Sequence, residues 1–216
     1  MFASIRRYRL QRGTLIKLAR RVDNGFAEEI AAQPGFVSYE FVDCGDGEVL
    51  TISIFQTAQA AEASREHARR WSDERLADFE FTKMAPLRGE ILVSRAGPVM
   101  LTPGHAGGAR KFASIRRHAL RRGDVTDLMH IIDESFADRI QALPGFHAYH
   151  ALDCGHGEIA AISVMSDQGA AEASDDLALE FVRDRLTAFN LERTEVIGGE
   201  VVVSRAMAQV LEPAHA

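Results

Sequence analysis

The chain has 216 residues, 46% hydrophobic and 26% charged, which is the composition of an ordinary globular protein. Its net charge of −6 argues against broad nucleic-acid binding, because that function requires a basic surface. No run approaches 18 apolar residues and no signal-peptide pattern opens the chain, so we expect neither a membrane partner nor export. Two cysteines make no disulfide framework, which favours the cytoplasm.

The sequence repeats itself at a fixed offset of 110 residues. Phe2 to Arg7 returns as Phe112 to Arg117, and Ala60 to Ser64 returns as Ala170 to Ser174. Roughly 40 of about 95 aligned positions are identical, and a period this long is a whole domain rather than a solenoid unit. The predicted units are domains at 1–96 and 112–206, a Gly- and Pro-rich linker at 97–111 and a C-terminal tail at 207–216.

The hydrophobic pattern and the turn residues of each copy predict the order strand, helix, strand, strand, helix, strand. The first helix begins after Thr14, where the second copy has Asp124, and both residue types can cap a helix N-terminus. It ends before Pro34-Gly35, and a second helix follows Thr57. In the first copy the predicted strands are 2–10, 36–43, 48–55 and 90–95. This βαββαβ order is the ferredoxin-like plan, an α+β fold with both helices on one face of a four-stranded sheet.

The third strand has two chemically different faces. One is fully apolar, and we expect it to pack under the helices: Leu50, Ile52 and Ile54. The other is mixed: Thr51, Ser53 and Phe55. A mixed face suits burial against a second sheet or around a cavity, and the second copy supplies such a sheet.

Three segments resemble a known family. They are the strand Phe-Ala-Ser-Ile-Arg-Arg, the Pro-Gly-Phe-x-x-Tyr entry to the hairpin, and Ala-Ala-Glu-Ala-Ser in the second helix. Together they resemble the dimeric α/β-barrel superfamily, and within it the antibiotic-biosynthesis-monooxygenase-like domains. The resemblance implies that the two ferredoxin-like repeats form one barrel inside the chain, a pseudo-dimer whose edge strands leave room for a further homodimer. It also implies a small-molecule ligand, of aromatic type, oxidised without a cofactor.

The same superfamily contains haem-degrading enzymes, which combine a helical His and Trp with a strand Asn. This chain has His67 and Trp71 four residues apart, but it has no Asn in its first strand. The second copy has Leu177 and Phe181 at the matching positions. We therefore interpret Trp71 as a core aromatic residue and do not expect haem cleavage.

Polar residues kept in both copies are the candidate site residues. Tyr39 and Tyr149 can give a hydroxyl to a phenolic ligand, or serve as structural tyrosines. Arg6 and Arg116 can stabilise a phenolate or enolate if they face the barrel, and are solvated charges if they face outward. Ser53 and Ser163 add small polar groups to the mixed face, where packing alone also explains them.

The histidines and cysteines give weaker signals. His118 and His150 are candidate general bases, with surface roles as the alternative. His147 and His150 lie three apart in a strand and point to opposite faces, so we expect no metal site. Cys44 and Cys154 are interpreted as turn residues.

Two functions stay open. One is a cofactor-independent monooxygenase acting on an aromatic substrate. The alternative is a non-catalytic ligand-binding or stress-related module whose barrel is filled by side chains. Small residues on the mixed face, namely Ser53, Ala161 and Ser163, favour a cavity, whereas a closed barrel filled by side chains in both repeats would reject the enzyme hypothesis.

Overall fold

The structure is a computed structural model that describes residues 1–108 and 110–216. Its centre is a closed barrel of eight strands in the order β3-β2-β9-β6-β8-β7-β5-β1, with β1 pairing back to β3. The first repeat supplies β1 (Phe2–Arg12), β2 (Phe36–Gly45), β3 (Glu48–Phe55), a short β4 (Glu80–Lys83) beside β1, and β5 (Leu87–Ala96). The second repeat supplies β6 (Lys111–Leu120), β7 (Phe146–Asp153), β8 (Glu158–Met165) and β9 (Leu191–Ala206). The α+β fold with two ferredoxin-like repeats in one barrel is as predicted.

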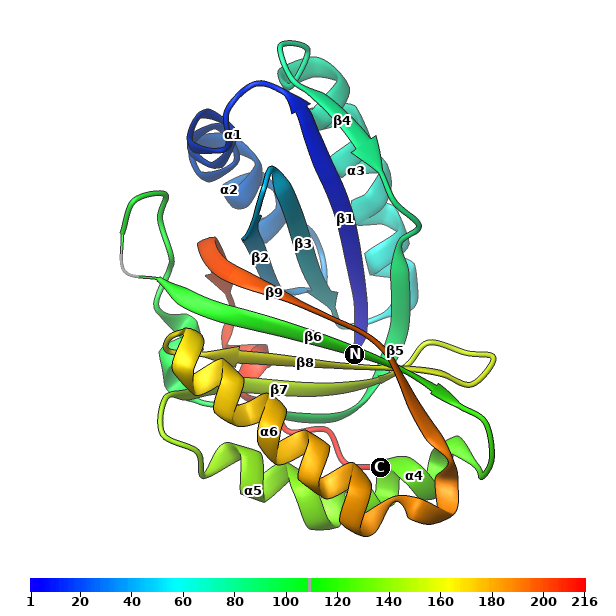
Figure 1. Ribbon diagram of the computed structural model, residues 1–216. Coiled ribbons are helices and arrows are strands. Elements are labelled where there is room, and N and C mark those ends of the chain that lie inside the picture. The colour runs from blue at the N-terminus through cyan, green and yellow to red at the C-terminus, as the bar shows by residue number, and fades with distance from the viewer. Residues whose placement is uncertain (109) are drawn as a thin grey trace.

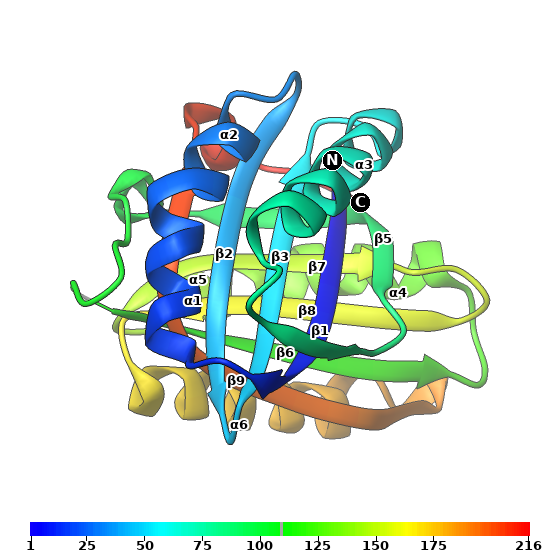
Figure 2. The same cartoon turned by 90° about the horizontal axis from the view of Figure 1, so that it is seen from above.

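The helices of each repeat cover the outside of its own sheet, so the barrel lies between two helical layers (Figure 1). In the first repeat these are α1 (Leu15–Arg21), a π-helical segment η1 (Val22–Phe26), α2 (Ala27–Ala31) and α3 (Ala58–Arg75). In the second they are α4 (Val125–Ile132), the π-helical η3 (Asp133–Ala137), α5 (Asp138–Gln141) and α6 (Gln168–Arg185), followed by a 3-10 turn, η4 (Thr187–Phe189). Seen from above, the strands of the two repeats run across one another (Figure 2).

The closing strand of each repeat joins the two halves. β5 pairs with β1 of its own repeat and with β7 of the other. β9 pairs with β6 of its own repeat and with β2 of the other. Each half therefore lends one strand to the sheet of its neighbour, as a symmetric dimer with exchanged edge strands would.

The interior of the barrel is filled by side chains. Leu50, Ile52 and Ile54 lie there, in one buried cluster with their second-repeat counterparts Ala160, Ile162 and Val164. The prediction that this apolar face packs under the helices is therefore wrong, and so is the prediction that the mixed face lines the barrel. Both faces of the sheet are covered, and the more apolar face takes the closed interior, while the mixed face lies under the helices, closer to solvent.

The helix caps follow the predicted pattern at three of four positions. Thr57 and Asp167 accept hydrogen bonds from the amides of Ala60 and Ala170, at 3.1 and 2.9 Å. Asp124 caps α4 in the same way, through the amide of Thr126 at 2.7 Å. Thr14 makes no side-chain cap bond, so the expected equivalence with Asp124 fails there.

The end of each repeat differs from the prediction in its strands. The short strand β4 is additional, and residues 84–86 separate it from β5. In the second repeat the same stretch is one continuous strand, β9. Pro86 stands where the second repeat has Val196. Because proline has no amide hydrogen to give to a ladder, it accounts for the break.

Two short 3-10 turns follow the closing strands, η2 (Pro98–Leu101) in the predicted linker and η5 (Ala208–Leu211) in the predicted tail. Each buries one apolar residue, Met100 or Val210, against the barrel. Residue 109 of the predicted linker lies outside the described residues. No helix in the described part of the chain is long and apolar enough to cross a membrane.

Candidate functional site

A cavity of about 460 Å³ lies between the sheet of the first repeat and its helices, outside the barrel. Its sheet wall includes Arg6, Tyr39 and Thr51, and its helical wall includes Phe26 and Trp71. Residues at the strand break complete it: Phe81, Lys83, Met84 and Pro86. Two predicted site residues, Arg6 and Tyr39, therefore share one cavity, although it is not the barrel cavity that the sequence predicted.

The cavity has an aromatic wall centred on Phe26. The ring of Phe26 lies 5.3 Å from that of Tyr39 and 5.2 Å from that of Trp71, measured between centroids. Trp71 is a buried core residue, as predicted, and it also lines the cavity. Such a wall suits a planar aromatic ligand.

Arg6 is a half-buried cation without a counter-ion among the described residues. It points neither into the barrel nor into open solvent, the two orientations considered from sequence, but into the cavity under the helices. Burial lowers the pKa of Arg6, an effect opposed by Tyr8 and Tyr39 and reinforced by the positive charges of Arg88 and Arg65. Among the described residues, none forms an ion pair or a hydrogen bond with its guanidinium.

The remaining charges of the cavity wall are mostly positive. They are Arg65, Arg69, Lys83 and Arg88, with Glu66 as the one acidic lining residue. Glu66 is paired with Arg69 at 2.7 Å, and both side chains are exposed. The wall therefore keeps an excess of positive charge around Arg6.

Tyr39 is a hydroxyl donor rather than a base. Burial raises its pKa far above the ordinary value, so the phenol stays protonated at neutral pH. Ser53 is the cross-strand neighbour of Tyr39 and also of Ser4. Both serine hydroxyls are buried without a hydrogen-bond partner, and neither belongs to the cavity wall itself.

The second repeat places the matching residues differently. Arg116 is fully buried and donates to Asp175 at 2.7 Å, to the carbonyl of Ser174 at 3.0 Å and to the hydroxyl of Ser163. Ser114 donates to the same Asp175 carboxylate at 2.9 Å. The second arginine is thus neutralised from within the chain.

The other two predicted residues of the second repeat are also buried. Burial raises the pKa of Tyr149 to about 12, and its ring packs against Phe136. Burial lowers the pKa of His118 to about 4, with Arg116 and Arg193 adding to the effect. A histidine with so low a pKa is a weak base, so the geometry gives little support to His118 in that role.

The residues that make the two repeats unequal were not among the predicted site residues. Asp175 and Arg65 follow directly after the identical segments that end at Ser174 and Ser64. The change from Arg65 to Asp175, directly after five identical residues, is visible in the sequence and could have indicated that the two repeats differ here. Tyr8, in the cavity wall at the position of His118, was also missed.

The thiols and the carboxylates suggest no further chemistry. Burial raises the pKa of both Cys44 and Cys154 to about 12, so neither is an activated thiol. Among the described residues, no group of three or more His, Cys, Asp or Glu side chains could hold a metal ion.

Comparison with known proteins supports the family at two levels. Residues 1–71 match the family model for antibiotic biosynthesis monooxygenase. No curated protein matches the chain in sequence. The solved structures that share the fold include a candidate monooxygenase from Fusobacterium nucleatum subsp. nucleatum ATCC 25586, at 6% identity and a TM-score of 0.68, with 99% of this chain and 94% of that chain covered.

Two further structures are similar over nearly the whole chain. A candidate monooxygenase from Lactobacillus acidophilus NCFM is 11% identical, with a TM-score of 0.61 and coverage of 95% of this chain and 97% of that one. An anthrone oxidase-like protein is 13% identical, with a TM-score of 0.53 and coverage of 100% and 96%. At these identities the structures establish the fold alone. The chain thus shares the fold of these structures, and its residues 1–71 are similar to the antibiotic biosynthesis monooxygenase family, which agrees with the resemblance found in the sequence.

Proposed function

We propose that this monooxygenase-like protein binds one aromatic small molecule in the cavity of its first repeat and oxidises it with O₂, without a metal or flavin. The observation that carries the proposal is the aromatic cavity of about 460 Å³ with the unpaired Arg6 in its wall. The two free cysteines are consistent with a cytoplasmic location.

Arg6 and Tyr39 have distinct roles in this proposal. Arg6 and its positive neighbours stabilise the anion of the substrate, a phenolate or an enolate, which is the form that gives an electron to O₂. Tyr39, protonated at neutral pH, donates a hydrogen bond to an oxygen of the substrate. Because no histidine lines the cavity, the substrate proton leaves to solvent rather than to a protein base.

The proposed oxidation needs no reactant besides the substrate and O₂. The substrate anion transfers one electron to O₂, and the resulting radical pair combines to form a carbon–oxygen bond in a hydroperoxide. Loss of water then leaves a carbonyl, so that a CH₂ group and O₂ become a C=O group and H₂O. The protein contributes shape, exclusion of bulk water and stabilisation of the anion.

Oxygen consumption with a panel of tricyclic phenols and anthrones tests the proposal. We expect turnover above the buffer rate for at least one of them, and a loss of about 100-fold in kcat/KM for Arg6→Gln, as for removal of one electrostatic group. Tyr39→Phe should lose about 10-fold or more. Arg9→Gln is the matched control, because Arg9 lies on the same strand but is half-exposed outside the cavity wall. Buffer-level rates throughout, or unchanged rates in Arg6→Gln, would reject the proposal.

A binding module without turnover is the second candidate. The filled barrel was the feature expected of that alternative, and it is present. The cavity wall also lacks a histidine that could act as a base. A protein that binds the aromatic panel but consumes no O₂ would decide for this candidate.

A further inference from the structure

Both repeats place the same arginine and two serines around the first strand, but only the second repeat adds a carboxylate to them; Arg116 Nε stays without a partner even there. In the second repeat, the Asp175 carboxylate accepts from the Arg116 guanidinium at 2.7 Å and from the Ser114 hydroxyl at 2.9 and 3.1 Å. Ser163 accepts a further bond from Arg116. A single carboxylate therefore satisfies one cation and one hydroxyl on the helix side of the sheet.

The first repeat keeps every member of this group except the carboxylate. Arg6, Ser4 and Ser53 stand at the positions of Arg116, Ser114 and Ser163. The hydroxyls of Ser4 and Ser53 are buried without partners, at 3% and 1% exposure. Arg6 has no described counter-ion. Buried polar groups without partners are costly, so the two hydroxyls, beside a half-buried cation, indicate a missing acceptor.

The residue that replaces the carboxylate has the opposite charge. Arg65 stands at the position of Asp175, and Arg88 stands where the second repeat has Gly198. Arg88 is the cross-strand neighbour of Ser4, and both arginines line the cavity with Arg6. Glu62 pairs with Arg65 and lies 4.0 Å from Arg88. Three cations thus surround the place that one carboxylate takes in the other repeat, with one exposed carboxylate nearby.

We propose that the ligand of the first repeat is an aromatic carboxylate, and that its carboxylate group binds Arg6 from the cavity as Asp175 binds Arg116. Its ring lies against the aromatic wall around Phe26. The second repeat holds its own carboxylate and binds no such ligand, so one molecule binds per chain. This inference uses the cavity of the proposed function but does not require turnover.

Isothermal titration calorimetry with 2-naphthoate and its neutral isostere 2-naphthamide tests the charge of the ligand. We expect 2-naphthoate to bind once per chain, at least about 10-fold tighter than the amide, since charge-assisted hydrogen bonds are about twice as strong as neutral ones. 2-Naphthol serves as the phenol of matching size. Equal or tighter binding of the amide or of the naphthol, or two naphthoates per chain, would overturn the inference.

Two substitutions test the position of the carboxylate. Arg6→Gln should weaken naphthoate binding at least about 10-fold and weaken amide binding much less, so that the preference for the carboxylate is lost. Arg65→Asp introduces the carboxylate of the second repeat and should weaken naphthoate binding at least about 10-fold more than Arg65→Ala, which removes only the charge. If the two Arg65 variants bind naphthoate equally, the correspondence with Asp175 is wrong. Arg9→Gln controls for general loss of positive charge, and circular dichroism confirms that each variant is folded.

The outcomes separate this inference from the proposed function. Tight, single-site naphthoate binding without O₂ consumption supports the carboxylate ligand and rejects the oxidation. Oxidation of neutral phenols without any preference for naphthoate supports the oxidation and rejects the carboxylate ligand.

Discussion

Arg65 and Asp175 occupy matching positions on the second helix of each repeat, one residue after a buried serine. The aspartate gives Arg116 an ion pair at 2.7 Å, whereas the arginine adds a positive charge beside Arg6. One change of residue therefore separates a sealed polar group from one that lacks its anion. The difference between the two repeats at this place originates in this charge reversal.

Buried titratable residues inside the barrel differ between the repeats as well. Burial raises the pKa of Glu40 to about 8, opposed by Lys111 and by a hydrogen bond from Ser38. At the matching position, burial lowers the pKa of His150 to about 4, and the ring nitrogen lies 3.0 Å from the Ser94 hydroxyl. Both groups are therefore neutral in the folded protein near pH 7.

These shifts predict a stability maximum near pH 6.5. Between pH 4 and 6.5 the unfolded chain binds protons that folded His150 and His118 do not, so unfolding free energy rises with pH. Between pH 4.5 and 8 folded Glu40 keeps a proton that the unfolded chain has lost, so its contribution falls with pH. From pH 6.5 to 8 the loss of the Glu40 contribution is the largest of these effects, and it amounts to about 2 kcal/mol by pH 8.

Urea unfolding of the wild type and of Glu40→Gln at pH 5, 6.5 and 8 measures this effect. The wild type should be most stable at pH 6.5, and Glu40→Gln should lose the decline between pH 6.5 and 8. His150→Gln should reduce the rise of the unfolding free energy between pH 5 and 6.5. A decline above pH 6.5 that persists in Glu40→Gln would show that another group causes it.

At the scale of elements, the turns after β5 and β9 connect the two repeats. Asp23, in the π-helical η1, binds Arg205 of β9 at 2.8 Å and the linker amide of Ala106 at 3.1 Å. Asp133, in η3, binds Arg95 of β5 at 2.6 Å and the tail amide of Ala216 at 3.2 Å. We infer that the repeat unit extends through these turns, to residues 106 and 216, which leaves a connection of only residues 107–110.

The same ion pairs should matter for stability, because their side chains are about nine-tenths buried. Arg205→Met leaves Asp23 without its main partner and should cost about 3 kcal/mol of unfolding free energy. The double variant with Asp23→Asn should lose clearly less than the sum of the single variants. Equilibrium unfolding of the wild type, the two single variants and the double variant measures the coupling energy between Arg205 and Asp23, and the same four proteins can be made for Arg95 and Asp133. Additive losses would mean that the paired side chains contribute to stability independently of each other.

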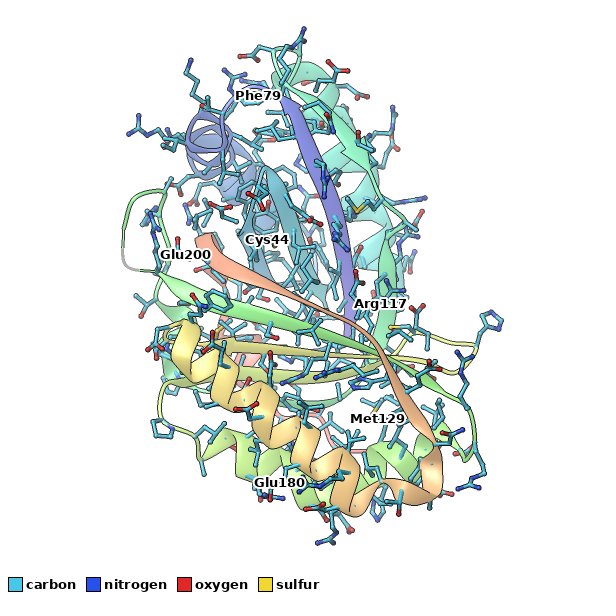
Figure 3. All side chains as sticks on the ribbon, in the orientation of Figure 1. Cys44, Phe79, Arg117, Met129, Glu180 and Glu200 are labelled. Carbon is cyan, nitrogen blue, oxygen red and sulfur yellow. The ribbon has the colours of Figure 1, made fainter. Side chains whose placement is uncertain are left out.

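At the scale of the whole molecule, the repeat and the hydrophobic pattern predicted two ferredoxin-like halves, and the family resemblance implied that they form one barrel. The prediction of which sheet face lines the barrel was wrong. The third strand alternates apolar and mixed residues, but both of its faces are covered, so the alternation does not say which face points into the barrel and which lies under the helices. The strand break could not be predicted from periodicity, although Pro86 opposite Val196 marks it. The ion pair of Arg117, labelled in Figure 3, with Glu195 could not be predicted either, because it depends on which strands become neighbours.

The candidate site was predicted in its residues more than in its location. Arg6 and Tyr39 do meet in one cavity, but on the helix side of the sheet. Identity between the copies selected these residues, whereas the positions that give the cavity its charge, Arg65 and Arg88, differ between the copies. A search for shared residues cannot find an asymmetric site, because asymmetry lies in the positions that changed.

A crystal structure of the chain with 2-naphthoate tests the central claim most directly. The account predicts one naphthoate per chain, in the cavity of the first repeat, with its carboxylate within about 3 Å of the Arg6 guanidinium. The second repeat should keep its pairing of Arg116 with Asp175. A naphthoate bound in the second repeat or inside the barrel, or one whose carboxylate points away from Arg6 to solvent, would contradict the account.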